Sequence, residues 1–184
     1  TPALPDAPAP VRDISASPDG MNVKINFTAP DKTADGSDLT SINSIEIFRG
    51  NDTEAAYSLT APKPGTAFSW TDTEAKAGFN AYRLVAANDA GESLPAYAST
   101  FCGDDYPSEP TEVSVHTDVA GQPVIEWMSP QTGLNGLPLD SHKLTYMIQR
   151  DINGRSEIIA EGITGTSYTD TSLDLSRQMY PYYY

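Results

Sequence analysis

Apolar and polar residues alternate along several short stretches of this chain. Residues 21–27 alternate strictly between apolar and polar side chains, and residues 82–87 keep one apolar face with the same period. Successive side chains of a β-strand point to opposite sides, so a period of two residues predicts strands with one face on a core. The apolar positions are Met21, Val23, Ile25 and Phe27 in the first stretch and Tyr82, Leu84 and Ala86 in the second.

Turn-forming residues separate the predicted strands at short intervals. Ser17-Pro18-Asp19-Gly20 predicts a turn, with proline in its second position and glycine in its fourth. Asn88-Asp89-Ala90-Gly91 predicts another, in which Gly91 adopts a positive φ and an Asn or Asp side chain bonds to its own backbone. Further strands are predicted around residues 11–14, 45–47, 56–59, 68–72 and 96–101. Short strands at this spacing are typical of a β-sandwich.

The pattern then repeats with an offset of 100 residues. Two copies of one domain in tandem are therefore predicted, because many turn and apolar positions match at once. The pairs at this offset are Pro10 with Pro110, Phe27 with Trp127, Pro30 with Pro130, and Leu39 with Leu139. Later matches drift by a residue or two, and they are Arg49 with Arg150 and Trp70-Thr71-Asp72 with Tyr168-Thr169-Asp170. Strands of the second copy are predicted at Val113 and Val115, at residues 123–127, at Tyr146 and Ile148, at Ile158 and Ile159, and at residues 180–184.

The run from Tyr82 to Ser93 resembles the F strand, FG turn and start of the G strand of fibronectin type III domains. The resemblance implies an all-β fold of two immunoglobulin-like (fibronectin type III) β-sandwiches in tandem, of the kind found in bacterial cell-surface or secreted proteins. It places Trp127 at the buried tryptophan of strand B, where the first copy has Phe27. Asn80 departs from the family, which has a tyrosine there whose hydroxyl ties the corner between strands E and F. The sequence leaves that hydrogen bond unaccounted for.

The repeat sets the expected domain boundaries. We expect an extended lead-in at residues 1–9, a first domain at 10–103, a short acidic linker at 104–109 and a second domain at 110–184. In the second domain the tyrosines at 180, 182 and 184 alternate as an F strand would, and no further turn or strand follows them in the sequence. We expect this domain to be incomplete, with its last strand missing. Either the chain is a fragment of a longer protein, which is the simpler interpretation, or a partner covers the open edge.

The charge of the chain argues against nucleic acids and anionic membranes as partners. The formal net charge is −14, with 11 basic residues against 25 acidic ones. Nucleic acids and anionic membranes need clustered Lys and Arg, so neither is an expected partner. No run approaches the roughly 18 apolar residues of a membrane helix, so no membrane insertion is expected. Protein or glycan partners remain, and an extracellular or cell-surface location is expected because the resemblance implies it.

The nucleophilic and metal-ligating residues form no pattern that predicts chemistry. Cys102 is the only cysteine, so no disulfide forms within the chain, and a small buried role is expected for it. His116 is expected on the outer face of its strand and His142 in a loop, without the spacing of metal ligands. We predict no catalytic residues, no cofactor and no metal site.

Three polar or aromatic clusters have alternative interpretations. Asp31, Asp35 and Asp38 share a loop and could bind calcium, but the matching loop of the second copy has no such carboxylates, so a solvated turn is the default. Asp104 and Asp105 could hold a cation at the join, although linker prolines explain that segment as well. The tyrosines of residues 180–184 could stack on sugars or anchor a partner, but strand tyrosines are commonly core residues.

Two functions follow as hypotheses. The first is a non-catalytic adhesion, spacer or protein-interaction module of a larger surface or secreted protein. The second is an accessory, glycan-binding module of a carbohydrate-active or other secreted enzyme whose catalytic domain lies outside this chain. A catalytic role for these residues themselves is not predicted.

Overall fold

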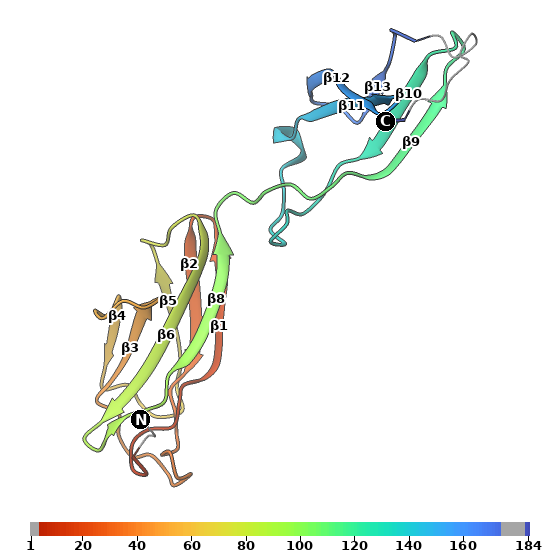
Figure 1. The fold of residues 1–184 in the computed structure, drawn as a ribbon. Helices are drawn as coiled ribbons and strands as arrows, with labels where there is room; N and C mark the ends of the chain where they lie inside the picture. The colour runs from red at the N-terminus through yellow and green to blue at the C-terminus, as the bar shows by residue number, and fades with distance from the viewer. Residues whose placement is uncertain (1–3, 174–182) are drawn as a thin grey trace. The chain divides into compact units, whose positions relative to one another are not determined.

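The computed structural model describes residues 4–173 and 183–184 of the chain. The chain forms two compact units, unit 1 from Thr1 to Asp104 and unit 2 from Asp105 to Tyr184 (Figure 1). No helix in the described ranges is long and apolar enough to cross a membrane.

Unit 1 is a sandwich of two antiparallel sheets. One sheet has the strand order β1-β2-β5, and the other has the order β4-β3-β6, with β7 and β8 both pairing with β6. The strands are β1 (Arg12–Asp19), β2 (Asn22–Thr28), β3 (Ser44–Arg49), β4 (Tyr57–Thr60), β5 (Ala67–Asp72), β6 (Gly78–Asn88), β7 (Gly91–Glu92) and β8 (Ala96–Cys102). This is the strand order of an immunoglobulin-like β-sandwich of the fibronectin type III kind, as the sequence predicted.

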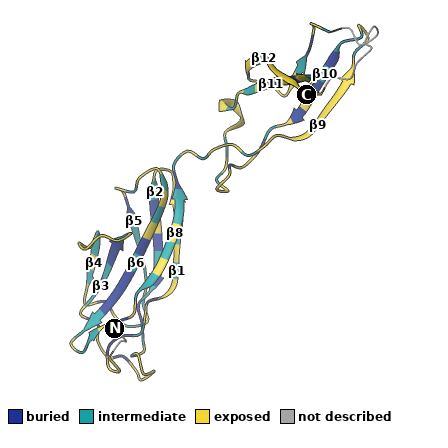
Figure 2. Ribbon diagram, in the orientation of Figure 1, coloured by how far each residue is buried: buried dark blue, intermediate teal, exposed yellow. Residues whose placement is uncertain are grey.

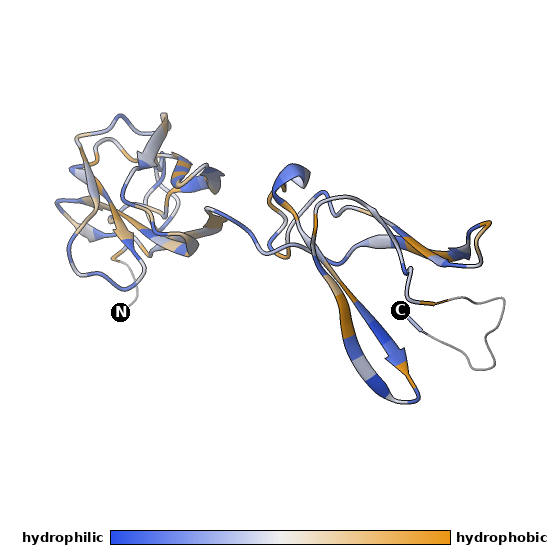
Figure 3. Cartoon of the chain, turned by 90° about the horizontal axis from the view of Figure 1, so that it is seen from above, coloured by the Kyte–Doolittle hydropathy of each residue, from blue (hydrophilic) through white to orange (hydrophobic). Residues whose placement is uncertain are grey.

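The alternating apolar positions of unit 1 meet between its sheets. Val23 and Ile25 of β2 pack in one core with Ile45 of β3 and with Leu84 of β6, and each of these side chains is 0% exposed. Figure 2 shows this as buried segments along β2, β3 and β6, and Figure 3 shows the alternating hydropathy of the strands. Burying large aliphatic side chains stabilises a fold by about 1.5–3 kcal/mol each, so this core holds the two sheets together.

The first hairpin turn differs from the prediction. Residues 18 and 19 are the last two of β1, and the turn consists of Gly20 and Met21, with Asp19 paired to Asn22. Gly20 has a φ of 61°, which suits a two-residue hairpin turn. Met21 therefore lies in the turn and is 54% exposed instead of sharing the core face.

Part of the predicted lead-in belongs to the fold of unit 1. Ala7 is fully buried, and its carbonyl accepts a hydrogen bond from the Ala34 amide at 2.8 Å. The Ala9 amide donates to the Lys32 carbonyl at 2.9 Å. These bonds fix residues 5–9 on the loop after β2, so this segment is not a free extended arm.

Unit 2 repeats the sheets of unit 1 in shorter form. The three-stranded sheet has the order β13-β10-β9, and β11 pairs with β12. The elements are β9 (Thr111–Thr117), β10 (Pro123–Met128), the short helix η1 (Ser141–Lys143), β11 (Tyr146–Ile152), β12 (Arg155–Ile163) and β13 (Ser167–Thr169). Its core comprises Ile125, Trp127 and Ile148 with partly buried neighbours. The predicted strand positions Tyr180 and Tyr182 lie outside the described residues, whereas Tyr183 forms a bridge with Asp151.

The second half of the predicted linker packs on a loop of unit 2. The Asp105 carboxylate accepts hydrogen bonds from the Asn135 amide at 2.9 Å, the Asn135 side chain at 2.8 Å and the Leu137 amide at 3.1 Å. Burial raises the pKa of Asp105, but these hydrogen bonds outweigh it and keep the pKa below its usual range. The carboxylate is therefore engaged in holding this loop.

A substitution at Gly133 tests the packing of Asp105 against this loop. A side chain there would meet the Asp105 carboxylate and would lie 2.6 Å from the Tyr106 carbonyl oxygen, which belongs to the backbone and cannot move freely. Gly133→Ala is expected to lower the free energy of unfolding of unit 2 by about 1–3 kcal/mol. Gly165→Ala is the matched control, because a side chain there meets nothing within 4 Å. Urea unfolding followed by Trp127 fluorescence, in chains that carry Trp70→Phe, measures both changes. Equal effects would contradict the close packing.

Candidate functional site

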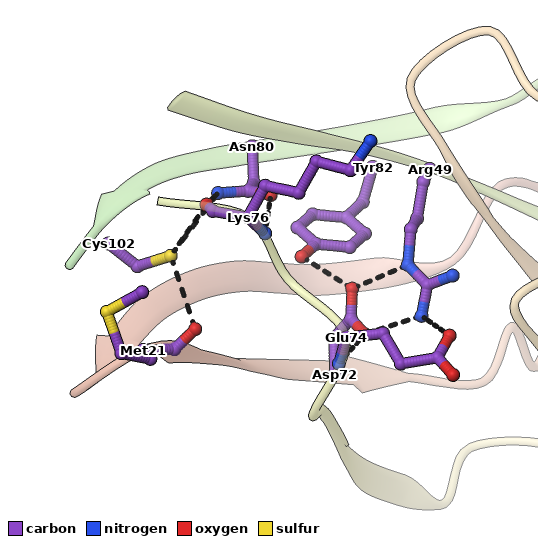
Figure 4. A network of polar contacts seen from close by, with 8 residues as sticks. All are labelled: Met21, Arg49, Asp72, Glu74, Lys76, Asn80, Tyr82 and Cys102. Atoms are coloured by element: carbon purple, nitrogen blue, oxygen red, sulfur yellow. Dashed lines mark hydrogen bonds and ion pairs between the residues drawn. The ribbon is translucent and has the colours of Figure 1, made fainter. Parts of the chain in front are cut away.

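A buried ion pair joins the two sheets of unit 1. Asp72, at the end of β5, is fully buried. Its carboxylate accepts hydrogen bonds from Arg49 of β3, with Nε at 2.8 Å and Nη2 at 2.6 Å, and from the hydroxyl of Tyr82 of β6 at 3.0 Å (Figure 4). Because β5 belongs to one sheet and β3 and β6 to the other, the cluster connects the sheets through three strands.

The electrostatics of this cluster hold each group in one protonation state. Burial raises the pKa of Asp72, but hydrogen bonds from Arg49, the Glu74 amide and Tyr82 outweigh it and lower the pKa. Hydrogen bonding to Asp72 raises the pKa of Arg49, and burial together with Asp72 raises the pKa of Tyr82. Asp72 and Arg49 are thus charged and Tyr82 neutral near pH 7. The three groups therefore hold the two sheets together, and none of them gains or loses a proton near pH 7.

Unit 2 contains the same cluster. Asp170 is 1% exposed, and its carboxylate accepts hydrogen bonds from Arg150 Nη1 at 2.7 Å and from the Tyr184 hydroxyl at 3.1 Å. Arg150 also donates to Ser172 and to Glu157. The structure confirms that Arg49 is equivalent to Arg150 and Asp72 to Asp170, because the same ion pair forms in each unit. The tyrosine equivalent to Tyr82 is Tyr184.

Alkaline unfolding of unit 2 tests the tyrosine of this cluster. Burial and the neighbouring Asp170 raise the pKa of Tyr184 to about 12. An unfolded tyrosine ionises near pH 10, so this contribution to stability is complete below about pH 10 and is lost as the pH rises towards 12. In Tyr184→Phe, the free energy of unfolding reported by Trp127 is expected to fall less over this range than in the parent chain. Equal falls in the two chains would contradict this assignment.

Asn80 replaces the corner tyrosine that the resemblance implied. Its amide nitrogen donates to the Lys76 carbonyl at 2.7 Å, and its oxygen accepts from the Lys76 amide (Figure 4). The amide nitrogen also donates to the Gly78 carbonyl at 3.0 Å. The corner between β5 and β6 is thus tied by a short side chain from within the corner itself. The same amide nitrogen donates to Sγ of Cys102, which is fully buried, as the sequence predicted.

A shallow groove of about 340 Å³ lies beside this cluster in unit 1, and its lining is partly polar and partly apolar. Phe79 contributes an aromatic ring that is 72% exposed. The other side chains that line the groove are those of Arg49, Asn51, Asp52, Glu74, Lys76, Asn80 and Ala81. An exposed ring beside hydrogen-bonding groups can stack on a flat ligand while the polar groups bond to it.

The histidines lie where the sequence placed them. His116 is on the exposed strand β9, with its Nδ1 3.6 Å from the Glu126 carboxylate. His142 lies in η1, capped by Asp140. Both belong to unit 2, whereas Cys102 belongs to unit 1. Within residues 4–173 and 183–184, no cluster of three or more His, Cys, Asp or Glu side chains could hold a metal ion.

The loop carboxylates considered for calcium each have a partner of their own. Asp31 pairs with Arg12 at 3.1 Å and Asp38 with Lys32 at 2.5 Å. Asp35 accepts hydrogen bonds from the Thr33 hydroxyl at 2.6 Å and the Ser37 amide at 3.0 Å, which lower its pKa. These contacts are those of a solvated, internally bonded turn.

Comparison with known proteins adds little beyond the fold. No family model matches the chain, and none of the curated proteins matches it. Among solved structures, a crystal structure of the chicken CNTN1 FN1–FN3 domains is similar, with 16% identity and a TM-score of 0.35. The match covers 91% of this chain and 54% of that one, so the chain spans about half the length of that structure. The fold assignment made above depends on strand order and core, and no functional argument is drawn from this likeness.

Proposed function

We propose that this chain is a non-catalytic extracellular module for adhesion, spacing or protein interaction within a larger surface or secreted protein of bacterial origin. The observation that supports it is the duplicated ion pair: in both units a buried acid, Asp72 or Asp170, accepts hydrogen bonds from an arginine of the opposite sheet and from a tyrosine. Charged ties between sheets resist their separation, which is what a spacer under load requires.

Forced unfolding of single molecules tests the spacer role. Pulled from its two ends, unit 1 is expected to unfold in one event that lengthens the chain by up to about 3.3–3.6 Å per residue released. Asp72→Ala should lower the unfolding force, because it removes the tie between the sheets. Gradual extension of the parent chain without a force peak would contradict a load-resisting role.

The groove beside Phe79 favours the alternative function, an accessory glycan-binding module of a secreted enzyme. An exposed ring and several amide, carboxylate and ammonium groups converge there. On a glycan array, Phe79→Ala should abolish any specific signal, whereas Tyr97→Ala should keep it, because Tyr97 is exposed but does not line the groove. Uniform absence of signal for the parent chain would remove this alternative.

A further inference from the structure

The hairpin between β11 and β12 turns on the dipeptide Asn153-Gly154 (Figure 1). Ile152 pairs with Arg155, so these two residues form the whole turn. Asn153 has a φ of 50° and Gly154 a φ of 77°. A two-residue turn with positive φ at both positions favours asparagine followed by glycine. The geometry of the hairpin therefore accounts for both residues, and it leaves both of them exposed.

The same dipeptide brings a carboxamide next to a backbone amide that can attack it. Glycine has no Cβ to hinder the approach, and a side chain added at Gly154 would meet nothing within 4 Å. Within residues 4–173 and 183–184, neither the Asn153 carboxamide nor the Gly154 amide has a hydrogen-bond partner. No bond therefore has to break before these two groups approach each other.

A second exposed Asn-Gly dipeptide in unit 2, Asn135-Gly136, has both of these groups bonded. The side-chain nitrogen of Asn135 donates to Asp105 at 2.8 Å, and the Gly136 amide donates to the Gly133 carbonyl at 3.0 Å. The carboxamide has to leave a charged acceptor before the backbone amide can reach it, and hydrogen bonds to charged groups are the stronger ones. One dipeptide is thus restrained and the other is not.

We propose that Asn153 is a site of spontaneous deamidation, from which Asn135 is protected by its hydrogen bonds. The Gly154 nitrogen attacks Cγ of Asn153, so an N–Cγ bond forms and the Cγ–Nδ2 bond breaks. The proton of the Gly154 amide leaves with the departing ammonia. Water then opens the five-membered ring to give aspartate or isoaspartate. One water enters and one ammonia leaves, and no electrons are transferred.

Both products change the tip of the hairpin. Each adds a negative charge next to Arg155. Isoaspartate also routes the main chain through its own Cβ, which lengthens a turn that holds Ile152 opposite Arg155 and Asp151 opposite Ser156. The reaction would therefore loosen the pairing at this end of β11 and β12 as the protein ages.

Incubation of the whole chain in mildly alkaline buffer, followed by trypsin digestion and mass spectrometry, tests the proposal. Trypsin cleaves after Lys and Arg, so Asn153 is recovered in residues 151–155 and Asn135 in residues 84–143. In the folded chain Asn153 should convert at least about tenfold faster than Asn135, because only Asn135 must first leave a carboxylate. In urea the two rates should agree within about threefold, because unfolding removes these hydrogen bonds. Equal rates in the folded chain, or conversion of Asn153 only in urea, would overturn the proposal.

Asp105→Ala tests the protection of Asn135. The substitution removes the acceptor of the Asn135 carboxamide, so conversion of Asn135 should accelerate towards the rate of Asn153. Asn153 has no contact with Asp105 and serves as the control within the same chain, with an unchanged rate. An unaltered rate at Asn135 would overturn the role given to its hydrogen bond.

The product is identified in the peptide of residues 151–155, where electron-transfer fragmentation distinguishes isoaspartate from aspartate. Hydrogen exchange then compares the aged chain with Asn153→Asp, which carries the same charge without the longer main chain. The amides of residues 151–156 should exchange faster in the aged chain than in this variant. Equal exchange in the two chains would overturn the loosened pairing.

Discussion

Replacing Asp72 by alanine is expected to lower the free energy of unfolding of unit 1 by about 3–5 kcal/mol. Asp72 is fully buried and accepts hydrogen bonds from Arg49 and Tyr82, so the substitution leaves the Tyr82 hydroxyl without its acceptor and Arg49 with only the exposed Glu74. A loss of this size is a large part of the 5–15 kcal/mol that stabilises a typical domain.

Urea unfolding followed by the fluorescence of Trp70 measures this loss, because Trp70 packs in the core of unit 1 and 6.4 Å from the Tyr82 ring. Trp127→Phe should be introduced in every chain so that Trp70 is the only reporter. Glu74→Ala is the control: Glu74 also contacts Arg49, but its side chain is 77% exposed, and such pairs contribute about 0–1 kcal/mol. If Asp72→Ala and Glu74→Ala have similar effects, the buried ion pair is not a major tie.

Ile47→Ala is expected to cost unit 1 about 2–5 kcal/mol, because it opens a cavity in a closed core. Ile47 is 0% exposed and lies opposite Leu84. The equivalent change in unit 2, Ile148→Ala, should cost less, since Ile148 lines an open pocket of about 260 Å³ and its removal widens a space that water already reaches.

The difference between the costs of Ile47→Ala and Ile148→Ala measures how well each core is closed to water. Trp70 reports on the first substitution and Trp127 on the second, each in a chain with phenylalanine at the other tryptophan position. An equal cost for both substitutions would mean that the pocket beside Ile148 is closed in solution.

The strands and the duplication could be predicted because both follow from patterns of residues along the sequence. Alternation around Ile25 and Leu84 and turn residues such as Gly91 suffice for single strands, and the offset between Arg49 and Arg150 shows the repeat. The function of Asp72 could not be read in this way. Its partners come from strands 23 and 10 residues away, so only the fold brings the three groups together.

The errors have physical causes of the same kind. Pro18 and Gly20 suggested a four-residue turn, but the pairing of Asp19 with Asn22 moved it to Gly20 and Met21. The sequence leaves the corner hydrogen bond at Asn80 unaccounted for, because the family forms that bond with a tyrosine. A side-chain amide can donate and accept at once, and Asn80 does both within the corner.

The single thiol of the chain, Cys102, is a probe of local opening in unit 1. Cys102 ends the edge strand β8, and its Sγ donates to the carbonyls of Lys76 and Met21 while shielded from water. Alkylating reagents can reach Cys102 only when β8 separates from the sheet, so the rate of labelling measures how often this local opening occurs. Unit 2 contributes no signal, because Cys102 is the only cysteine of the chain. Fast labelling would mean that β8 often separates from β6 while the rest of unit 1 stays folded.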